Sequence, residues 1–298
     1  MSFRDELHRL TEGRVRTAEP LDRHTTFRIG GPAEFYVAPR SVAEAGAVVA
    51  LAHAEGVPVR VLGNGSNLIV PDTGVRGLVL HISRALAGVE RNADDLHAGA
   101  GLPLVQLMQF AARRGLEGME WACGIPGTVG GAILTNAGTP EGDMGTATIG
   151  IEVVEADGAV RTLAPGDFTF AYRRSSLRGQ GRVVVGVTVR LRRGDGDAIA
   201  ARIQSYNQRR LRTQPVGTWN SGCIFKNCPP HRIGQEIDRA GLKGLRSGHA
   251  SISTVHGNFI VNEGGARAAD VLELIATIKR VLEPRLGVRL EEEVEIWS

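Results

Sequence analysis

The sequence has few cysteines, few aromatic residues and no long hydrophobic run. Only three of its 298 residues are cysteine, namely Cys123, Cys223 and Cys228, and this sparse, odd set argues against a disulfide framework. No segment approaches the roughly 18 apolar residues that a membrane helix needs. The first residues, MSFRDELHRLTEG, are charged and lack the hydrophobic segment of a secretory signal. We therefore expect a cytoplasmic protein that does not bind a membrane.

Lysine is also scarce, because arginine carries nearly all of the positive charge. Arginines cluster at 173–178, 190–193 and 209–212, and the net charge is +3. Such clusters fit either solvated faces or a site for a small anion, since the guanidinium fork matches phosphate and carboxylate. Aromatic residues make up only 5% of the chain and no basic stripe alternates with stacking residues. We therefore expect no nucleic-acid partner.

A metal site is an alternative for one short segment. Cys223, Cys228 and His231 lie close together in the sequence. A fourth ligand is not evident, however, and the spacing is not that of a standard zinc site. We therefore predict no metal.

Sequence patterns predict an α+β protein of about two domains, with a boundary near residue 195. Ser41 precedes a helix that runs to Ala54, with Glu44 positioned for a capping box and Gly56 for the end. Asp157-Gly158 predicts a hairpin. The two strands around this turn lie within 151–163. The further predicted elements are strands at 34–39, 57–62, 77–82, 182–194 and 288–297, and helices at 103–115, at 268–287, and from the composition change at 195–200 to about 212. The last helix has apolar positions at Val271, Leu272, Ile275, Ile278 and Leu282.

Two loops of small residues suggest a phosphate-bearing cofactor, because glycine lets bare backbone N–H groups approach an anion. The first, VLGNGSNLIV, begins at 61, and the second, GIPGTVGG, spans 124–131. The first loop does not match the Rossmann fingerprint, since Leu68 stands where the third glycine belongs and Pro71 prevents a following helix. In the second loop, Thr128 is placed to begin a short helix. Either loop could also be a tight structural turn.

The motifs together resemble the vanillyl-alcohol-oxidase (PCMH) type of FAD-binding domain. Within that group the chain is similar to the UDP-N-acetylenolpyruvoylglucosamine reductase family, in its shorter form. The resemblance rests on VLGNGSNLIV, GIPGTVGGAILTNAG, FAYRRSSLR (170–178), QPVGTWNSGCIFKN (214–227), HGNFIVN (256–262) and the terminal EV (293–294). It implies an FAD-binding domain over 1–195, in subdomains of about 1–85 and 86–195, and a C-terminal α+β substrate-binding domain over 196–298.

The resemblance also implies the ligands and the reaction. FAD, bound non-covalently, would lie against the two glycine loops, and NADPH would be the co-substrate. The substrate would be UDP-N-acetylglucosamine-enolpyruvate, which takes a hydride at C3 and a proton at C2 to give UDP-N-acetylmuramate for peptidoglycan synthesis and cell-wall formation. We expect a monomer or weak oligomer. The implied cofactor-binding residues are Gly63, Asn64, Gly65, Ser66, Asn67, Gly124, Ile125, Gly127, Thr128, Gly130 and Gly131.

The resemblance implies catalytic roles for three residues. Arg173, rather than Arg174, would stabilise charge on the substrate carboxylate. Cys223 stands where the family usually has a serine proton donor, and a thiol, with a reference pKa of about 8.5, is a competent acid. Glu293 would help to polarise the enolpyruvyl group.

Strand alternation places Glu293 on the polar face, where it could face a cleft. The same alternation places Glu292 on the apolar face with Val288, Leu290, Val294 and Ile296, where a buried carboxylate would need a partner. Glu292 therefore stays a rival. Tyr172, Lys226 and Asn227 are the implied substrate contacts, whereas His256 and Asn258 are weaker candidates. Another FAD-dependent oxidase or dehydrogenase of the same fold, or a non-catalytic nucleotide-binding protein, would also fit the glycine loops.

Overall fold

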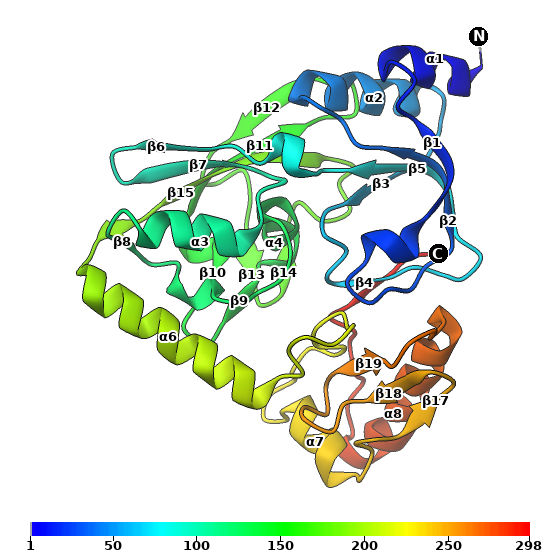
Figure 1. Cartoon of the computed structure of the whole chain (residues 1–298), viewed down its shortest axis with the longest axis vertical. Coiled ribbons are helices and arrows are strands. Elements are labelled where there is room, and N and C mark those ends of the chain that lie inside the picture. The colour runs from blue at the N-terminus through cyan, green and yellow to red at the C-terminus, as the bar shows by residue number, and fades with distance from the viewer. Residues whose placement is uncertain (1) are drawn as a thin grey trace. The chain divides into compact units, whose positions relative to one another are not determined.

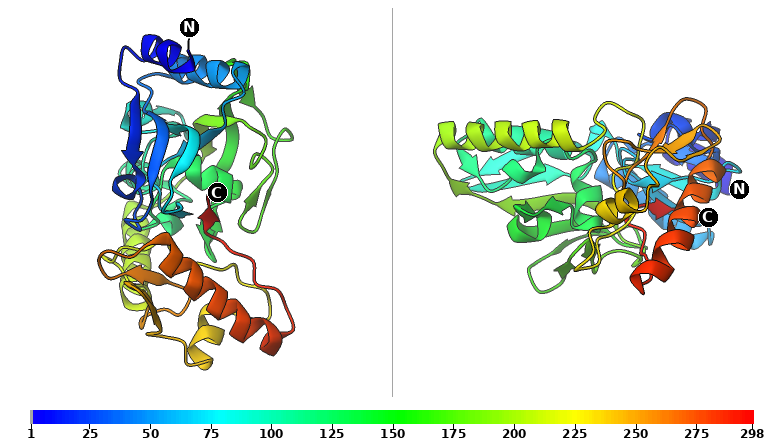
Figure 2. Two further views of the ribbon diagram at one scale, coloured as in Figure 1. Left: turned by 90° about the vertical axis from the view of Figure 1, so that its right-hand side faces the viewer. Right: turned by 90° about the horizontal axis from the view of Figure 1, so that it is seen from below.

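The computed structural model describes residues 2–298, except the side chain of Arg84, and the chain divides into two compact units (Figures 1 and 2). The first unit contains the chain up to Ala18, Glu34–Asn64 and Arg76–Gln208. The second contains Glu19–Ala33, Gly65–Val75 and Arg209–Ser298. The division therefore passes through the first glycine loop, between Asn64 and Gly65.

A four-stranded sheet and two helices form the beginning of the first unit. The strand order is β1 (Arg16–Pro20), β2 (Pro32–Val37), β5 (Val75–His81) and β3 (Val59–Leu62), with β3 parallel to β5. Helix α2 (Val42–Ala54) contacts β3 and α1 (Phe3–Leu10). Ser41 Oγ accepts the Glu44 N–H, as predicted, and Gly56 follows the helix with φ +64°. The Glu44 carboxylate accepts the Arg40 N–H instead, so the predicted box is only half formed.

A five-stranded antiparallel sheet forms the rest of the first unit. Its order is β12 (Val160–Leu163), β11 (Thr148–Val154), β15 (Val183–Arg190), β7 (Asp95–Gly99) and β6 (Val89–Asn92). The predicted Asp157-Gly158 turn joins β11 to β12, with Gly158 at φ +83°. The apolar face of this sheet and helix α3 (Leu104–Ala112) share one buried core with α2. This core supports the loops that carry the second glycine motif.

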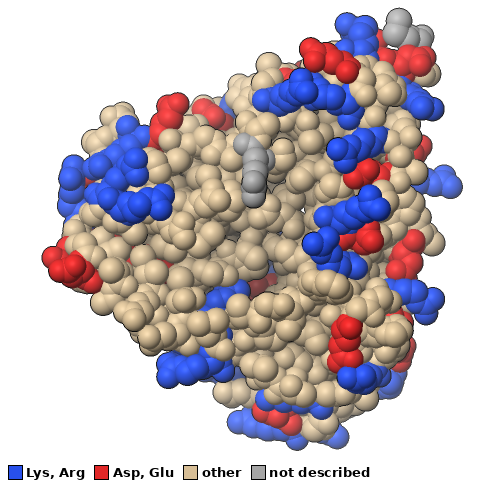
Figure 3. Space-filling view, viewed as in Figure 1, with Lys and Arg blue, Asp and Glu red and all other residues tan. Residues whose placement is uncertain are grey.

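Short elements complete the first unit. They are η2 (Arg84–Leu86), β8 (Leu116–Glu117), η3 (Glu120–Ala122), α4 (Val129–Thr135), β9 (Gly138–Thr139), β10 (Gly142–Asp143), α5 (Met144–Ala147), β13 (Phe170–Ala171), β14 (Arg174–Ser175) and β16 (Arg192–Arg193). Lys and Arg side chains gather at the left of Figure 3, over the end of the β6–β7 hairpin. In that region Arg190 pairs with Asp95, and Arg193 with Asp94. The 190–193 arginine cluster is therefore a solvated, charge-paired surface.

Helix α6 (Gly196–Thr213) links the two units in sequence, and it forms where a helix was predicted to reach about residue 212. The predicted boundary at 195 lies just before this helix, whereas the contacts divide the chain within it, after Gln208. The assignment of FAD and substrate binding to separate domains stays a prediction.

The second unit packs helix α8 (Ala268–Leu286) and helix α7 (Ile233–Arg239) on the sheet β17 (Arg246–Ser247), β18 (Ala250–Ile252) and β19 (Ile260–Asn262). Also in this unit are η1 (Leu21–His24) and the parallel pair β4 (Leu68–Ile69) and β20 (Glu295–Ile296). Asp72 caps α8 from 196 residues away, accepting the N–H groups of Ala268 and Ala269. The segments 19–33 and 65–75 are thus integral to the unit.

Two predictions for the C-terminal region need correction. Leu272 is 37% exposed, and Leu274 takes its place in the core. The predicted strand at 288–297 reduces to β20, because residues 291–294 run along the Cys223 segment instead of a regular sheet. Consequently Ile296 is exposed and Trp297 is buried, which breaks the predicted alternation. Among the described residues no helix is long and apolar enough to span a membrane.

Candidate active site

The two glycine loops meet around a cavity in the first unit. It bounds about 360 Å³ of empty space, part of it open to solvent. The first loop contributes Gly63 and the second Thr128, Gly130 and Gly131. The remaining lining residues are Val61, Ile82, Ala100, Leu134, Arg182 and Val184. Four of the predicted cofactor-binding residues therefore share one cavity wall.

Close packing explains why glycine is needed at this wall. A Cβ atom on Gly63 would lie 2.6 Å from Thr128 Oγ1, and one on Gly130 would lie 2.8 Å from the Ala100 Cβ. Thr128 caps the short helix α4, as predicted, because its Oγ1 accepts the Gly131 N–H at 3.3 Å. Gly124 and Gly127 have φ of +70° and +120°, which favours glycine at both positions. The residues present thus form a bare-backbone cradle that fits a phosphate-bearing cofactor.

Asn64 stays with Gly63 in the first unit, whereas Gly65, Ser66 and Asn67 belong to the second unit. Gly65, at φ +58°, lies against the His24 carbonyl, which leaves no room for a Cβ. Asn67 donates its side-chain amide to the Glu293 carbonyl at 3.0 Å, and its own carbonyl accepts the Glu295 N–H. Asn67 therefore holds the C-terminal segment, and this contact was not predicted.

Arg173 lies at the tip of the β13–β14 hairpin in the first unit. Its φ is +54°, a left-handed conformation that is unusual for arginine. Arg173 is half-buried, whereas Arg174 and Tyr172 are exposed. Asn136 ends α4 in the same left-handed region and donates its amide to the Ala171 carbonyl at 3.1 Å. Helix α4 and the hairpin are thereby joined, which places Arg173 on the same unit as the glycine cavity.

Cys223 and Glu293 are brought together by the second unit. The Glu293 N–H donates to the Ile224 carbonyl at 2.8 Å, directly after Cys223, and Phe225 bridges to Glu292. Cys223 is half-buried and its backbone bridges to Phe259. These two predicted catalytic residues, 70 positions apart in sequence, are therefore neighbours through their backbones.

Asn258 fixes the segment that carries Cys223. Its Oδ1 accepts the Phe225 N–H at 3.0 Å, its Nδ2 donates to the Phe225 carbonyl at 2.7 Å, and its own carbonyl accepts the Ile224 N–H. The side chain is only 3% exposed. Asn258 thus supports the site through the backbone, which explains its place in the sequence motif.

The neighbouring lysine and asparagine are also anchored. Lys226 is 8% exposed, and its Nζ pairs with Glu291 Oε1 at 2.6 Å. Asn227 Oδ1 accepts the Ile233 N–H at 3.0 Å, just as α7 begins. Their substrate contacts stay predictions, but both side chains have defined positions in the second unit.

The two candidate glutamates differ in their surroundings. Glu292 forms an ion pair with Lys279 of α8. Glu293 lies half-buried next in the chain, with its backbone tied to Ile224 and Asn67. Glu292 is therefore engaged with helix α8, and the choice of Glu293 as the catalytic glutamate stays a prediction.

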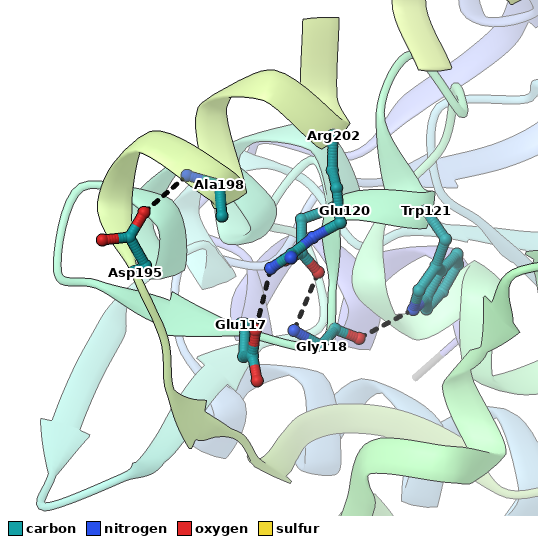
Figure 4. A network of polar contacts seen from close by, with 7 residues as sticks. All are labelled: Glu117, Gly118, Glu120, Trp121, Asp195, Ala198 and Arg202. Carbon is teal, nitrogen blue, oxygen red and sulfur yellow. Dashed lines mark hydrogen bonds and ion pairs between the residues drawn. The ribbon is translucent and has the colours of Figure 1, made fainter. Parts of the chain in front are cut away.

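A partly buried charge network, with Glu120 at its buried end, supports the second glycine loop (Figure 4). Arg202 of α6 donates to Glu120 Oε1 at 2.7 Å and to Glu117 Oε2 at 2.8 Å. Glu120 Oε2 accepts the Gly118 N–H, and the Gly118 carbonyl accepts the Trp121 indole N–H at 2.9 Å. Trp121 leads directly into the 124–131 loop, so the network fixes the base of that loop to α6.

The pKa of Glu120 reflects this network. Burial raises the pKa, but the hydrogen bonds from Arg202 and from backbone N–H groups outweigh it, so the net pKa lies below its ordinary value of 4.5. The carboxylate is therefore charged and paired at neutral pH.

His256 has a structural environment. Its ring packs edge-on against Phe259, and its Nδ1 accepts the Asn258 N–H. Burial, and then the charge of Lys243, lower its pKa below 6.5, which keeps the ring neutral. This agrees with the structural interpretation of a lone histidine in this segment. Among the described residues, no three His, Cys, Asp or Glu side chains gather in a way that could hold a metal ion.

Comparison with known proteins gives a consistent match over both units. Residues 33–164 match the model of an FAD binding domain, and residues 214–297 match that of the UDP-N-acetylenolpyruvoylglucosamine reductase C-terminal domain. A UDP-N-acetylenolpyruvoylglucosamine reductase of Symbiobacterium thermophilum is 45% identical over 96% of this chain and 93% of its own. One from Desulfosudis oleivorans is 42% identical over 99% of this chain and 98% of its own.

A solved structure agrees with these matches. The crystal structure of the reductase from Thermus caldophilus, at 40% identity, has a TM-score of 0.84 and covers 96% of this chain and 99% of its own. The predicted α+β fold with an FAD-binding domain is thereby confirmed. FAD is the cofactor that this fold implies, and the glycine cradle fits it.

Proposed function

The chain belongs to the UDP-N-acetylenolpyruvoylglucosamine reductase family, and we infer that it reduces UDP-N-acetylglucosamine-enolpyruvate to UDP-N-acetylmuramate with NADPH. The single observation that carries this inference is the family match over both units at 45% identity. Bound FAD would pass two electrons as hydride from NADPH to C3 of the enolpyruvyl group. The protein's own residues must then manage the charge on the substrate and the proton that C2 receives.

Arg173 is proposed to hold the substrate carboxylate. Hydride addition at C3 shifts negative charge onto C2 and the carboxylate, and a fixed guanidinium stabilises that charge. The left-handed turn at Arg173 and the Asn136 bond to Ala171 hold the hairpin in place, which supports this role. Preorganisation of this kind avoids reorganisation during the reaction.

Cys223 is proposed to give its thiol proton to C2. A positioned acid within reach of the developing carbanion contributes about 10²–10⁴-fold to such a step. The flanking backbone is held by Asn258 and Phe259, which supports a fixed position for the thiol. The thiolate regains its proton from solvent before the next turnover.

Glu293 is proposed to polarise the enolpyruvyl group through a hydrogen bond. Its backbone contact with Ile224 keeps it beside the Cys223 segment. Lys226, with the amide nitrogen of Asn227, is proposed to bind the UDP diphosphate, and Tyr172 to contact the substrate from the Arg173 hairpin. We further propose that the enzyme acts in the cytoplasm, as a monomer or weak oligomer.

Two half-reactions in sequence test this function. The purified protein is reduced with NADPH without oxygen, and the UDP-enolpyruvyl sugar is then added. Bleaching of the flavin band near 450 nm followed by prompt recovery is expected. A protein that bleaches but is not reoxidised by this sugar would contradict the proposed substrate, and a protein that takes up no FAD would contradict the cofactor.

A further inference from the structure

Arg182 has no part in the chemistry described above, yet it lines the glycine cavity. It lies immediately before β15 and follows both glycine loops in the sequence. The other lining residues are glycine, alanine, threonine and aliphatic side chains. Arg182 is therefore the only charged residue among the described residues that bound this cavity.

The guanidinium of Arg182 is held in position by two neighbours. Its Nε donates to Glu155 Oε2 at 3.1 Å, and its Nη1 donates to Gln180 Oε1 at 3.0 Å. Glu155 is itself fixed, because it opens the tight turn between β11 and β12 and its backbone bonds to Ala159 and Gly158. With its side chain 29% exposed, Arg182 is a partly buried and oriented cation.

Local charge favours an anion at this position. Glu155 is shared by two arginines, since Arg161 also approaches it at 3.8 Å. The three side chains together carry one net positive charge. Arginine has five N–H donors, and the two bonds to Glu155 and Gln180 use only two of them. The remaining donors form a fork of the kind that matches phosphate oxygens.

We propose that Arg182 binds the diphosphate of FAD and so makes this chain prefer FAD to flavins and nucleosides that lack a diphosphate. The proposal rests on the cofactor of the family, and it adds a specificity-determining residue that the glycine motifs do not contain. The glycine N–H groups supply uncharged contacts to the phosphates, whereas Arg182 supplies the counter-charge.

The test measures cofactor release from the holoenzyme and needs no turnover. Holoenzyme is diluted, and the fluorescence of the released flavin gives the FAD dissociation constant. Arg182→Ala is expected to weaken FAD binding by about 10–100-fold, the range for a charge-assisted hydrogen bond. Arg161→Ala is the matched control, because it removes the other partner of Glu155 from an exposed position and should change FAD affinity less than about twofold.

Competition with ADP and with adenosine identifies the part of FAD that is bound. In the wild-type protein ADP should displace FAD at lower concentration than adenosine, and Arg182→Ala should remove this advantage. If Arg182→Ala still binds ADP more tightly than adenosine by the wild-type factor, the proposal is overturned. If the variant loses affinity for ADP and adenosine equally, Arg182 stacks on the adenine instead, which also overturns the proposal. If Arg182→Ala fails to fold, Arg182→Gln decides, since it removes the cation but keeps much of the side chain: wild-type affinity for FAD would overturn the proposal, and a several-fold loss confined to FAD and ADP would support it.

Discussion

Glu292 is paired with Lys279, whereas its neighbour Glu293 is tied to the Cys223 segment by the Ile224 carbonyl. The two adjacent glutamates therefore have different roles. Glu292 anchors the C-terminal segment to helix α8, whereas Glu293 lies beside Cys223, the proposed proton donor.

Substitution of each glutamate by glutamine should distinguish the catalytic role from the structural role. Glu293→Gln is expected to slow reoxidation of the reduced flavin by the UDP-enolpyruvyl sugar by roughly 10²-fold or more, with reduction by NADPH unchanged. Glu292→Gln should leave both half-reactions near wild-type rates and lower the unfolding midpoint slightly, because it removes one partly exposed ion pair. Rapid-mixing absorbance and thermal melts measure the two effects. The reverse pattern would assign the chemistry to Glu292.

Arg173→Ala should slow the second half-reaction by roughly 10²–10³-fold while FAD stays bound, since it removes a fixed charge that stabilises the transition state. Arg174→Ala, on the exposed neighbour in the same hairpin, is the control and should react normally. Single-turnover reoxidation is the measurement. Wild-type turnover in Arg173→Ala would remove this residue from the mechanism.

Glu120 should make stability depend on pH in the acid range. Its folded pKa lies below the ordinary 4.5, so the unfolded chain binds more protons in that window. The stabilisation is fully present above about pH 4.5 and is lost as pH falls through the folded pKa. Glu120→Gln should therefore lower stability at neutral pH and flatten this acid limb, as measured by urea unfolding from about pH 3 to pH 7.

A surface pair provides the comparison for Glu120. The hydrogen bond from Arg190 lowers the pKa of Asp95 as well, but this pair lies at the surface, so Asp95→Asn should change the unfolding midpoint much less. An acid limb that is unchanged in Glu120→Gln would show that the Arg202 network does not contribute to stability.

Asp72→Ala should destabilise the second unit by roughly 0.5–2 kcal/mol, because it leaves two N–H groups at the start of α8 without their cap. Asp72→Asn should lose much less, since asparagine caps helices almost as well. Chemical denaturation measures both. Equal losses for alanine and asparagine would mean that charge, and not capping, is what Asp72 supplies.

Local signals explain which parts of the fold were predictable. Ser41, Gly56 and the Asp157-Gly158 turn fix helix ends and a hairpin through contacts a few residues away, and all three were confirmed. The 288–297 segment was not predictable, because its partners are the Cys223 segment and Asn67, which are distant in sequence. Its alternating pattern described a sheet that the fold does not form.

The same distinction applies to the site. The glycine loops were predictable because close backbone approach has a compositional signature. Arg182, the Asn67–Glu293 contact and the Arg202–Glu120 pair were missed, since they depend on contacts made across 27 to 226 residues. No spacing within the sequence marks such residues before the fold is known.

The most direct test of the account is anaerobic single-turnover mixing of the NADPH-reduced enzyme with the UDP-enolpyruvyl sugar, comparing wild type, Cys223→Ser and Cys223→Ala. We predict equal reduction by NADPH in all three, reoxidation that persists in Cys223→Ser, and reoxidation slowed by roughly 10²–10⁴-fold in Cys223→Ala. Rapid reoxidation of Cys223→Ala would contradict the assignment of Cys223 as the proton donor, and failure of the wild type to reoxidise would contradict the proposed reaction.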